Sequence, residues 1–278
     1  MTTLITGARG GIGRSLLHRL HASGHDVRAA GRAPEKAQLP AGVPAVALDL
    51  AEPKTFASAL AGVTDVFLYA EPGGIDALLD AAVSAGVRRV VLLSSDSVVV
   101  CDGERNALAR HHLLVEQALR AAPLTATVLR PGGFATMALG WAEFIRAGQP
   151  VEQLYPETRL DVIHPEDIAE VAELALTTDK LDGETITLGG PEVMSFRDQV
   201  RTLGELLDRQ IEVREPTRKQ AAEQLASHVP PALVEAVLDY WAMLPERSEA
   251  SRSTAMISGR PGRTFSQWAT ENLTTFQR

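Results

Sequence analysis

The stretch Thr6-Gly7-Ala8-Arg9-Gly10-Gly11-Ile12-Gly13 decides the fold of this 278-residue chain. It follows Thr3–Thr6, a short apolar run that is typical of a buried strand. It leads into Ile12–Ser23, where apolar residues recur at helical spacing as far as Gly24, a residue that favours the end of a helix. Glycines in a turn between a strand and a helix let the backbone approach an anion closely, and the first N–H groups of the helix then face that anion.

The first half of the chain continues as alternating strands and helices. Predicted strands cover residues 27–30, 43–48, 65–70, 89–94 and 125–129, and predicted helices cover residues 53–60, 74–85 and 104–121. The run Val90–Leu93 is apolar throughout, which is typical of a strand buried on both faces of a parallel sheet. This order predicts an α/β protein with right-handed crossovers and a Rossmann-type, doubly wound parallel sheet.

The pattern changes after Arg130-Pro131-Gly132-Gly133. Helices are predicted at residues 136–146, 165–176, 195–207, 217–227, 231–243 and 264–272, with short strands at 151–155, 160–163 and 185–188. We expect residues 1–131, with returning segments near 159–190, to form the domain that contains the sheet. Residues 132–278 are expected to form a smaller, mostly helical C-terminal lobe that receives a substrate or a partner.

The spacing of the glycines favours a dinucleotide as the bound anion. Gly7, Gly10 and Gly13 satisfy the G-x-x-G-x-x-G pattern, here in the strand–turn–helix context that gives this pattern its meaning. A mononucleotide P-loop is excluded, because it needs glycine at the position of Ala8 and lysine at the position of Arg14. We therefore predict that the cofactor contacts Gly7, Ala8, Arg9, Gly10, Gly11, Ile12 and Gly13.

The end of the second strand indicates which nicotinamide cofactor is bound. In NAD-binding proteins an acidic residue there holds the ribose 2′-hydroxyl, but this chain has Ala29-Ala30-Gly31-Arg32. Arg32 and Arg9, with Arg28 or Lys36 as further candidates, are suited to hold the 2′-phosphate of NADP. We predict NADP(H) as the cofactor, with NAD(H) as the less favoured alternative.

Composition excludes several other classes of protein. A net charge of -8 argues against nucleic acid as a partner. The single cysteine, Cys101, forms neither an internal disulfide nor a cysteine zinc site, and we expect no metal and no reactive role for this thiol. No apolar run approaches membrane-spanning length, and a strand follows Met1 almost at once, so we expect a cytoplasmic protein without a signal peptide. The oligomeric state is not predicted.

The chain resembles the short-chain dehydrogenase/reductase superfamily, and most closely its atypical, NmrA-like branch. The resemblance spans about the first 175 residues and is more specific where the glycine loop is combined with Arg130–Phe134. The stretches that carry it are Thr6–Gly13, Val27–Lys36, Asp49-Leu50, Ser94-Ser95, His112–Leu119, Arg130–Phe134 and Pro165–Ala172. The resemblance implies NAD(P) binding, by either a reductase or a redox-sensing regulator.

The resemblance also implies further contacts to the cofactor. Asp49 and Leu50 would lie beside the adenine, with Ala70 and Glu71 along the dinucleotide. Ser94 and Ser95 would lie near the nicotinamide. Its far side would be covered by Pro131, Gly133 and Phe134. From the residues alone, the less favoured alternatives are that Asp49 caps a helix before Pro53 and that Ser94-Ser95 forms a turn after a strand.

One departure from the superfamily concerns its proton donor, a tyrosine four residues before a lysine. No lysine lies four residues after Tyr69, Tyr155 or Tyr240. The resemblance aligns Leu108 with the tyrosine and His112 with the lysine, so carbonyl reduction of the usual tyrosine-dependent kind is not expected.

Three residues are candidates for proton transfer instead. His112 is suited to hold the cofactor ribose or relay a proton, unless it is simply a residue of the helix surface. Ser95 and His164 are the other two candidates, although the position of His164 favours capping a helix or making a hydrogen bond at the edge of the core.

These residues predict an NADPH-dependent oxidoreductase. Without the tyrosine–lysine pair, the favoured substrate is a flat, apolar small molecule that accepts hydride readily, such as a quinone-like compound or a conjugated carbonyl. An aromatic natural-product intermediate would be one example. The alternatives are a non-catalytic NADP(H)-binding redox sensor and a tailoring enzyme of the same fold that performs no net reduction.

Overall fold

The chain divides into two compact units, each made of three separate segments. The computed structural model describes residues 1–36, 38–244 and 251–277. The first unit comprises Met1–Ser95, His111–Pro131 and Pro165–Thr187. The second unit comprises Asp96–Arg110, Gly132–His164 and Leu188–Arg278.

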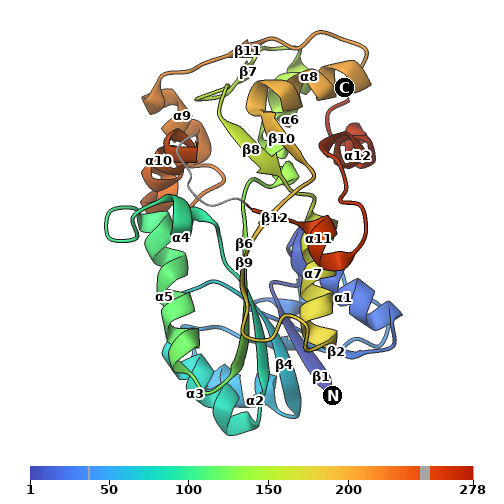
Figure 1. Ribbon diagram of the computed structural model, residues 1–278, viewed down its shortest axis with the longest axis vertical. Helices are drawn as coiled ribbons and strands as arrows, with labels where there is room; N and C mark the ends of the chain where they lie inside the picture. Colours follow the sequence, from blue (N-terminus) through green and yellow to red (C-terminus); the bar gives the residue numbers. More distant parts are fainter. Residues whose placement is uncertain (37, 245–250, 278) are drawn as a thin grey trace. The chain divides into compact units, whose positions relative to one another are not determined.

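A parallel sheet forms the centre of the first unit (Figure 1). Its strands run in the order β3-β2-β1-β4-β5-β6-β9, and the short strand β12 pairs with the last two residues of β9. The order β3-β2-β1-β4-β5-β6 is that of the Rossmann fold, so the predicted doubly wound parallel sheet is confirmed. The strands are β1 (Thr2–Thr6), β2 (Asp26–Gly31), β3 (Ala45–Ala47), β4 (Val63–Tyr69), β5 (Arg89–Leu93), β6 (Thr125–Pro131), β9 (Thr185–Gly189) and β12 (Arg252–Ser253).

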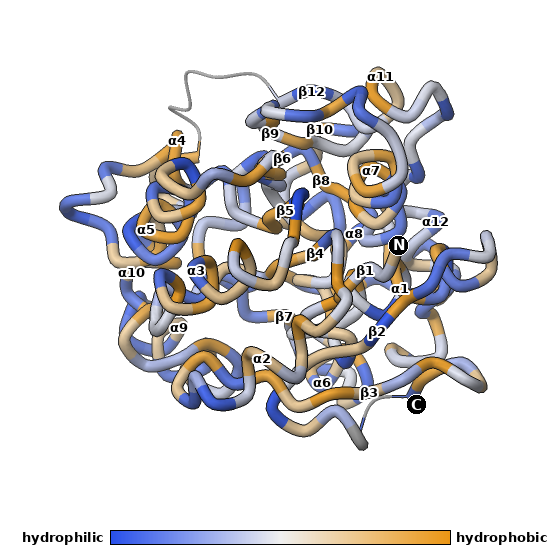
Figure 2. The backbone as a smooth tube through the Cα atoms, turned by 90° about the horizontal axis from the view of Figure 1, so that it is seen from below, coloured by the Kyte–Doolittle hydropathy of each residue, from blue (hydrophilic) through white to orange (hydrophobic). Residues whose placement is uncertain are grey.

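Helices cover both faces of this sheet, as Figure 2 shows from below. One face is covered by α1 (Gly11–Ala22) and α7 (Pro165–Thr177), which are joined by an ion pair of 2.8 Å between Arg19 and Glu173. The other face is covered by the remaining helices of this unit. These are α2 (Phe56–Leu60), α3 (Ile75–Ala85) and α5 (Ala107–Ala121), with the 3₁₀ turns η1 (Pro34–Lys36) and η2 (Pro53–Thr55) beside the sheet edge.

Burial on both faces explains why the central strands are almost entirely apolar. Leu4, Ile5, Val91 and Leu92 have no exposed surface, and successive side chains of one strand point to opposite faces. Burial of each such side chain contributes roughly 1.5–3 kcal/mol to folding. The carboxyl ends of these parallel strands therefore lie at one rigid edge, which is where ligands bind in such folds.

A buried ion pair connects two of these strands to α5. Glu116 of α5 is 1% exposed, and Arg130 of β6 donates to both of its carboxylate oxygens, at 2.9 and 2.5 Å. The Ser94 hydroxyl, just after β5, donates to the same carboxylate at 2.6 Å. The charges of Arg130 and Glu116 neutralise each other, and the three side chains together hold the ends of β5 and β6 in place against the helix.

The second unit is built around an aromatic core and is mostly helical. Trp141, Phe196, Phe265, Trp268 and Phe276 are all buried in it. Its strands are β7 (Val151–Glu152), β8 (Arg159–Val162), β10 (Glu192–Ser195) and β11 (Val213–Arg214). Its helices are α4 (Ser97–Val100), η3 (Ala135–Trp141), α6 (Ala142–Ala147), α8 (Phe196–Leu206), α9 (Arg218–Leu225), η4 (Pro231–Leu233), α10 (Val234–Met243), α11 (Thr254–Ser258), α12 (Phe265–Glu271) and η6 (Leu273–Thr275).

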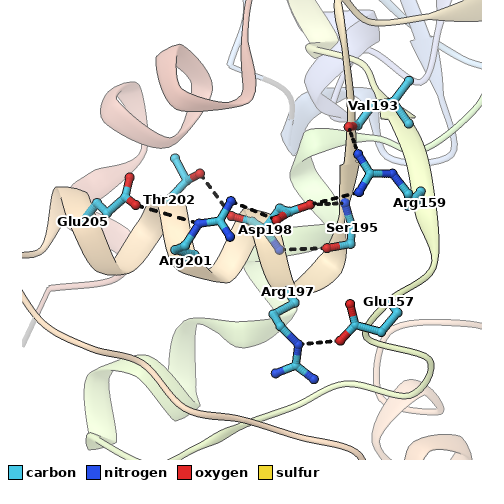
Figure 3. A network of polar contacts seen from close by, with 9 residues as sticks. All are labelled: Glu157, Arg159, Val193, Ser195, Arg197, Asp198, Arg201, Thr202 and Glu205. Atoms are coloured by element: carbon cyan, nitrogen blue, oxygen red, sulfur yellow. Dashed lines mark hydrogen bonds and ion pairs between the residues drawn. The ribbon is translucent and has the colours of Figure 1, made fainter.

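The start of α8 is fixed by side chains on β8 and β10 (Figure 3). Ser195 and Asp198 form a capping box, in which each side chain accepts the backbone N–H of the other. Arg159 of β8 pairs with the same Asp198 at 3.6 Å and donates to the Val193 carbonyl at 2.9 Å. The antiparallel pair β8–β10 and the helix that follows it therefore form one connected piece.

The predicted elements agree with the structure best where the sequence pattern is long. The helix predicted at 136–146 is divided into η3 and α6, and the strand predicted at 151–155 ends at Glu152. Tyr155 has a left-handed backbone, with φ of 53°, which no strand accommodates. The short strands β10, β11 and β12 were not predicted, because two to four residues carry no measurable periodicity. No helix among the described residues is long and apolar enough to cross a membrane.

The buried ion pair makes a prediction about stability. Arg130→Met leaves the Glu116 carboxylate buried without its counter-charge, so the free energy of unfolding should fall by about 3–5 kcal/mol. Chemical denaturation measures this loss. The double variant Glu116→Gln/Arg130→Met removes both charges and should recover most of the stability, and a double variant as unstable as the single one would contradict this account.

Candidate functional site

The glycine loop between β1 and α1 forms a tight turn in the first unit. Gly7 has a left-handed backbone, with φ of 65°, and its carbonyl accepts the N–H of Gly10 at 2.8 Å. Such a backbone strains any residue with a side chain. The turn therefore requires glycine at position 7, as the motif predicts.

The third glycine of the motif permits close packing of helix against strand. A Cβ atom on Gly13 would lie 2.5 Å from the Gly7 carbonyl oxygen, inside van der Waals contact. A Cβ atom on Gly11 would meet nothing within 4 Å, so the loop is open on that side. Of the other loop residues, Ala8 and Ile12 are buried, whereas Arg9 and Gly10 are exposed.

The N-terminus of α1 is prepared to receive an anion. Its N-cap is Gly10, which has no side chain to accept a hydrogen bond, and the first turn of the helix contains no acidic residue. The first N–H groups of a helix have no carbonyl in a preceding turn to bind, and they form the positive end of the helix dipole. This end of the helix favours a pyrophosphate as ligand.

Tyr69, the last residue of β4, lies directly over the glycine loop. Its hydroxyl accepts the N–H of Gly13 at 3.3 Å, and its ring lies 2.5 Å from where a Cβ atom on Gly7 would be. Its contact with Gly13 joins residues 56 positions apart, and no local pattern signals such a contact.

The end of β2 offers positive charge and no carboxylate. Arg32 follows the strand directly and is exposed. Arg28, a further candidate for the 2′-phosphate, is instead engaged in the fold, because its guanidinium donates to the carbonyls of Ala59 and Ala61 at 2.8 and 2.9 Å. Arg32 and Arg9 therefore stay as the exposed arginines predicted to bind the 2′-phosphate.

The residues predicted beside the adenine lie in the loop after β3. The Asp49 carboxylate accepts the N–H of Ala51 at 3.0 Å and so forms a local turn. It does not cap the helical turn that starts at Pro53, whose N-cap is Glu52. A Cβ atom on Gly74 would lie 2.2 Å from the Leu50 carbonyl oxygen, so this loop packs closely on the start of α3.

Ala70 and Glu71 follow β4 and are held by local and longer contacts. His111 of α5 lies 3.0 Å from the Ala70 carbonyl through its Nε2. The Glu71 carboxylate accepts the N–H of Gly73 at 3.1 Å. Both residues therefore stay at the same sheet edge as the glycine loop, since β4 pairs with β1 in parallel.

Ser94 and Ser95 follow β5 at this edge. Ser94 is buried and donates its hydroxyl hydrogen to Glu116, so its side chain contributes to the fold. Ser95, the next residue, is half-buried. Their role toward a nicotinamide stays a prediction.

His112 is a neutral, half-buried histidine. Burial, and to a lesser extent the neighbouring His111, lowers its pKa to about 4, although Glu116 opposes the shift. Its Nδ1 atom is buried and has no hydrogen-bond partner among the described residues. A neutral imidazole is an unsuitable acid at neutral pH, but an unpaired ring nitrogen is suited to bind a hydroxyl group.

Other predicted site residues belong to the second unit. Gly133 lies against Leu160, where a Cβ atom would approach the leucine side chain to 2.0 Å, and Phe134 bridges to Ile163. His164 is 3% exposed, and its Nε2 lies 3.2 Å from a carboxylate oxygen of Glu271. The structure thus gives His164 a partner in α12. Pro131, by contrast, ends β6 in the first unit.

Cys101 has no reactive character. The thiol is buried, and burial together with the charges of Asp96 and Asp239 raises its pKa to about 11. It is therefore protonated at neutral pH and a poor nucleophile. Within the described residues, no group of three or more histidine, cysteine, aspartate or glutamate side chains is arranged to hold a metal ion.

The residues of the first unit fit a dinucleotide. The loop leaves room at Gly11, the start of α1 offers unpaired N–H groups, and the buried Nδ1 of His112 needs a partner that the described residues do not supply. A pyrophosphate and a ribose hydroxyl match these needs. The site therefore defines a dinucleotide-binding protein of the Rossmann class.

Comparison with known proteins identifies the family. A family model described as NAD(P)H-binding matches residues 7–179, and the chain belongs to this NAD(P)H-binding family. The NAD(P) binding that the resemblance implied is thus confirmed at the level of the family.

Two relatives align over almost the whole chain. The (4-alkanoyl-5-oxo-2,5-dihydrofuran-3-yl)methyl phosphate reductase of Streptomyces griseus is 32% identical and covers 98% of each chain. The NAD(P)H azoreductase of Xenophilus azovorans is 28% identical, with the same coverage.

Two solved structures share the fold. The triphenylmethane reductase of Citrobacter sp., complexed with NADP(H), has a TM-score of 0.80 at 18% identity and covers 98% of this chain and 99% of its own. The NADPH-dependent quinone oxidoreductase of Escherichia coli, complexed with NADPH, has a TM-score of 0.82 at 19% identity with the same coverage.

The geometry of the glycine loop predicts that alanine substitutions at Gly13 and Gly11 differ in their effect on stability. Gly13→Ala places a methyl group against the Gly7 carbonyl and should lower the free energy of unfolding by about 1–3 kcal/mol. Gly11→Ala places its methyl group in open space and should lower it by less than about 0.5 kcal/mol. Thermal or urea denaturation of the two variants tests this difference, and equal losses would argue against the packing described.

The depressed pKa of His112 makes a prediction about pH. An unfolded chain takes up a proton at this histidine near pH 6.5, whereas the folded chain resists it down to about pH 4. The folded state should therefore lose up to about 3 kcal/mol of stability from this group as pH falls through that window. Urea denaturation between pH 7 and 4 should show a smaller loss for His112→Gln, and parallel curves would mean that His112 titrates normally.

Proposed function

We propose that this chain, an NAD(P)H-dependent oxidoreductase, uses NADPH to reduce a quinone-like compound or a conjugated carbonyl. The observation that carries the proposal is the glycine loop in its structural context. Between β1 and α1 it has a turn that requires glycine, an open face at Gly11 and a helix N-terminus whose N-cap, Gly10, has no side chain to accept a hydrogen bond. These features suit the pyrophosphate of a dinucleotide, and the family to which the chain belongs binds NAD(P)H.

The preference for NADPH rests on the charge at the end of β2. Gly31 and Arg32 stand where an acidic residue would hold the 2′-hydroxyl of NAD. Arg32 is exposed, so its guanidinium is available to form two hydrogen bonds to a 2′-phosphate. Arg9, also exposed, adds positive charge on the glycine loop.

The residues around the nicotinamide end are proposed to bind and orient the cofactor. His112, neutral at physiological pH, would hold a ribose hydroxyl through its unpaired Nδ1. His112 would therefore bind the ribose as the superfamily's lysine does at the aligned position, but without that lysine's positive charge. Ser95 is the remaining candidate for a hydrogen bond to the nicotinamide or the substrate.

The absence of the tyrosine–lysine pair favours an electron-poor acceptor. When bound, reduced cofactor supplies a hydride, and a proton from solvent completes the reduction of such an acceptor. Quinones and conjugated carbonyls spread the developing negative charge over several atoms, so they need less help from an acid at the moment of transfer. No residue of the first unit then has to act as a strong proton donor.

The names of relatives support this substrate class. The Streptomyces griseus relative reduces, by its name, an unsaturated lactone that carries an alkanoyl group, which is a conjugated acceptor. The structurally similar Escherichia coli protein is named a quinone oxidoreductase. We propose a flat small molecule of this kind as substrate here, and the cytoplasm, where NADPH is maintained, as the place of reaction.

The proposal is tested by NADPH binding, followed by NADPH oxidation at 340 nm against a panel of quinones, enones and unsaturated lactones. Consumption of NADPH in step with substrate is the expected result. Tight binding without turnover across the panel would contradict the reductase proposal and favour a redox sensor. Absence of NADPH binding would contradict both.

The cofactor preference gives a separate prediction. Arg32→Ala should weaken NADPH binding about 10–100-fold, because it removes charged hydrogen bonds to the 2′-phosphate, and should change NADH binding less than about twofold. Isothermal titration or fluorescence titration measures both. Arg105→Ala, which removes an arginine with an 89% exposed side chain outside the proposed site, is the matched control and should change neither. Equal losses for the two cofactors would exclude Arg32 from 2′-phosphate binding.

A further inference from the structure

Tyr69 is the last residue of β4, and its side chain packs against the glycine loop that follows β1. The ring lies against Gly7, and the hydroxyl reaches the start of α1, where it accepts the N–H of Gly13 at 3.3 Å. The strand holds the residue firmly, since the Tyr69 N–H donates to the Thr6 hydroxyl at 2.9 Å. The side chain is therefore fixed between the end of one central strand and the loop of its neighbour.

The tyrosine hydroxyl still has one hydrogen bond to give. A phenol oxygen accepts hydrogen bonds through its lone pairs and donates one through its hydrogen. The lone pair is used by Gly13, but among the described residues no acceptor is found for the hydroxyl hydrogen. The group is half-buried, so an unused donor there is costly unless a ligand or solvent accepts it.

The Tyr69 hydroxyl lies beside the second glycine of the motif. It lies 3.3 Å from the position that a Cβ atom on Gly10 would occupy. Gly10 is the second glycine of the motif, whose missing side chain lets the backbone approach the pyrophosphate. The tyrosine hydroxyl thus lies on the side of the loop on which the phosphates are expected.

We propose that Tyr69 is a cofactor-binding residue whose hydroxyl donates a hydrogen bond to a pyrophosphate oxygen while it accepts the N–H of Gly13. The inference rests on the dinucleotide site of the proposed function. The N–H of Gly13 lies deeper in α1 than the N–H groups of Gly11 and Ile12. It would therefore contact the phosphate indirectly, through the Tyr69 hydroxyl. The Tyr69 hydroxyl thus adds one hydrogen-bond donor to the backbone N–H groups at the start of α1.

The phenol is in the form that this role needs, and burial only reinforces it. Burial raises the pKa of Tyr69 above its ordinary value, and the Gly13 N–H only partly offsets this effect. The hydroxyl is therefore neutral and retains its hydrogen at physiological pH. A phenolate would repel the phosphates, whereas a neutral hydroxyl donates to them.

Tyr69→Phe tests the proposal, because it removes the hydroxyl and keeps the ring on Gly7. NADPH should bind about 10–100-fold more weakly, as expected for the loss of a hydrogen bond to a charged group. Adenosine 2′-monophosphate, which lacks the pyrophosphate, should displace NADPH with an unchanged affinity of its own. Tyr155→Phe, which removes a hydroxyl that contacts Arg218 in the second unit, is the matched control and should leave NADPH binding unchanged.

Each outcome decides the matter. Unchanged or tighter NADPH binding by Tyr69→Phe would overturn the proposal, and so would an equal loss for NADPH and adenosine 2′-monophosphate, which would indicate a distorted loop. Failure of the unmodified protein to bind NADPH would instead overturn the proposed function. If Tyr69→Phe does not fold, ¹⁹F spectra of protein labelled with 3-fluorotyrosine replace it, since the chain has 3 tyrosines. The resonance that persists in both Tyr155→Phe and Tyr240→Phe should shift on addition of NADPH, and a stationary resonance would refute the contact.

Discussion

The close approach of α1 to β1 at the glycine loop is the constraint on which the rest of the first unit depends. Gly13 has no space for a side chain, because the Gly7 carbonyl lies where a Cβ atom would be. The helix therefore starts immediately beyond the strand, with its first N–H groups at the edge where the parallel strands end. The position of α1 on the sheet is also fixed by α7, which lies beside it on the same face and holds it through the ion pair of Arg19 with Glu173. A turn of a few residues thus determines both where α1 packs on the sheet and where an anion can bind.

The charges of the first unit are divided between the fold and the site. Glu116 and Arg130 neutralise each other in the interior and use the Ser94 hydroxyl as well. The glycine loop and the start of α1 contribute backbone N–H groups, the Tyr69 hydroxyl that contacts them and the exposed Arg9, and Arg32 follows β2. The carboxylates of Asp49 and Glu71 at this sheet edge accept backbone N–H groups of their own turns. Such a set of donors and arginines suits a ligand that carries several negative charges and binds mostly through its phosphates. It also explains why an overall acidic chain can hold an anionic cofactor.

The sheet and its ligand class were predictable because they depend on local patterns, namely glycine spacing and apolar strands. The contacts that complete the site are of another kind. Tyr69 with Gly13, His111 with Ala70 and Ser94 with Glu116 join residues 56, 41 and 22 positions apart. Periodicity says which face of an element is buried, but not which side chain of a distant element meets it. For the same reason the sequence pattern could not show that Arg28 donates to carbonyls at the C-terminal end of α2, although its residue type suits a phosphate.

The interleaving of the two units has a consequence for how the chain is made. Synthesis proceeds from the N-terminus, and the first unit lacks α7 and β9 until Thr187 has emerged from the ribosome. By then two of the three segments of the second unit have also been made, although that unit needs the rest of the chain. A nascent chain that ends near Pro131 would expose the apolar face of α1 and of the sheet that α7 later covers. Neither unit is a contiguous fragment of the chain, so a single cut in the sequence cannot separate one complete unit from the other.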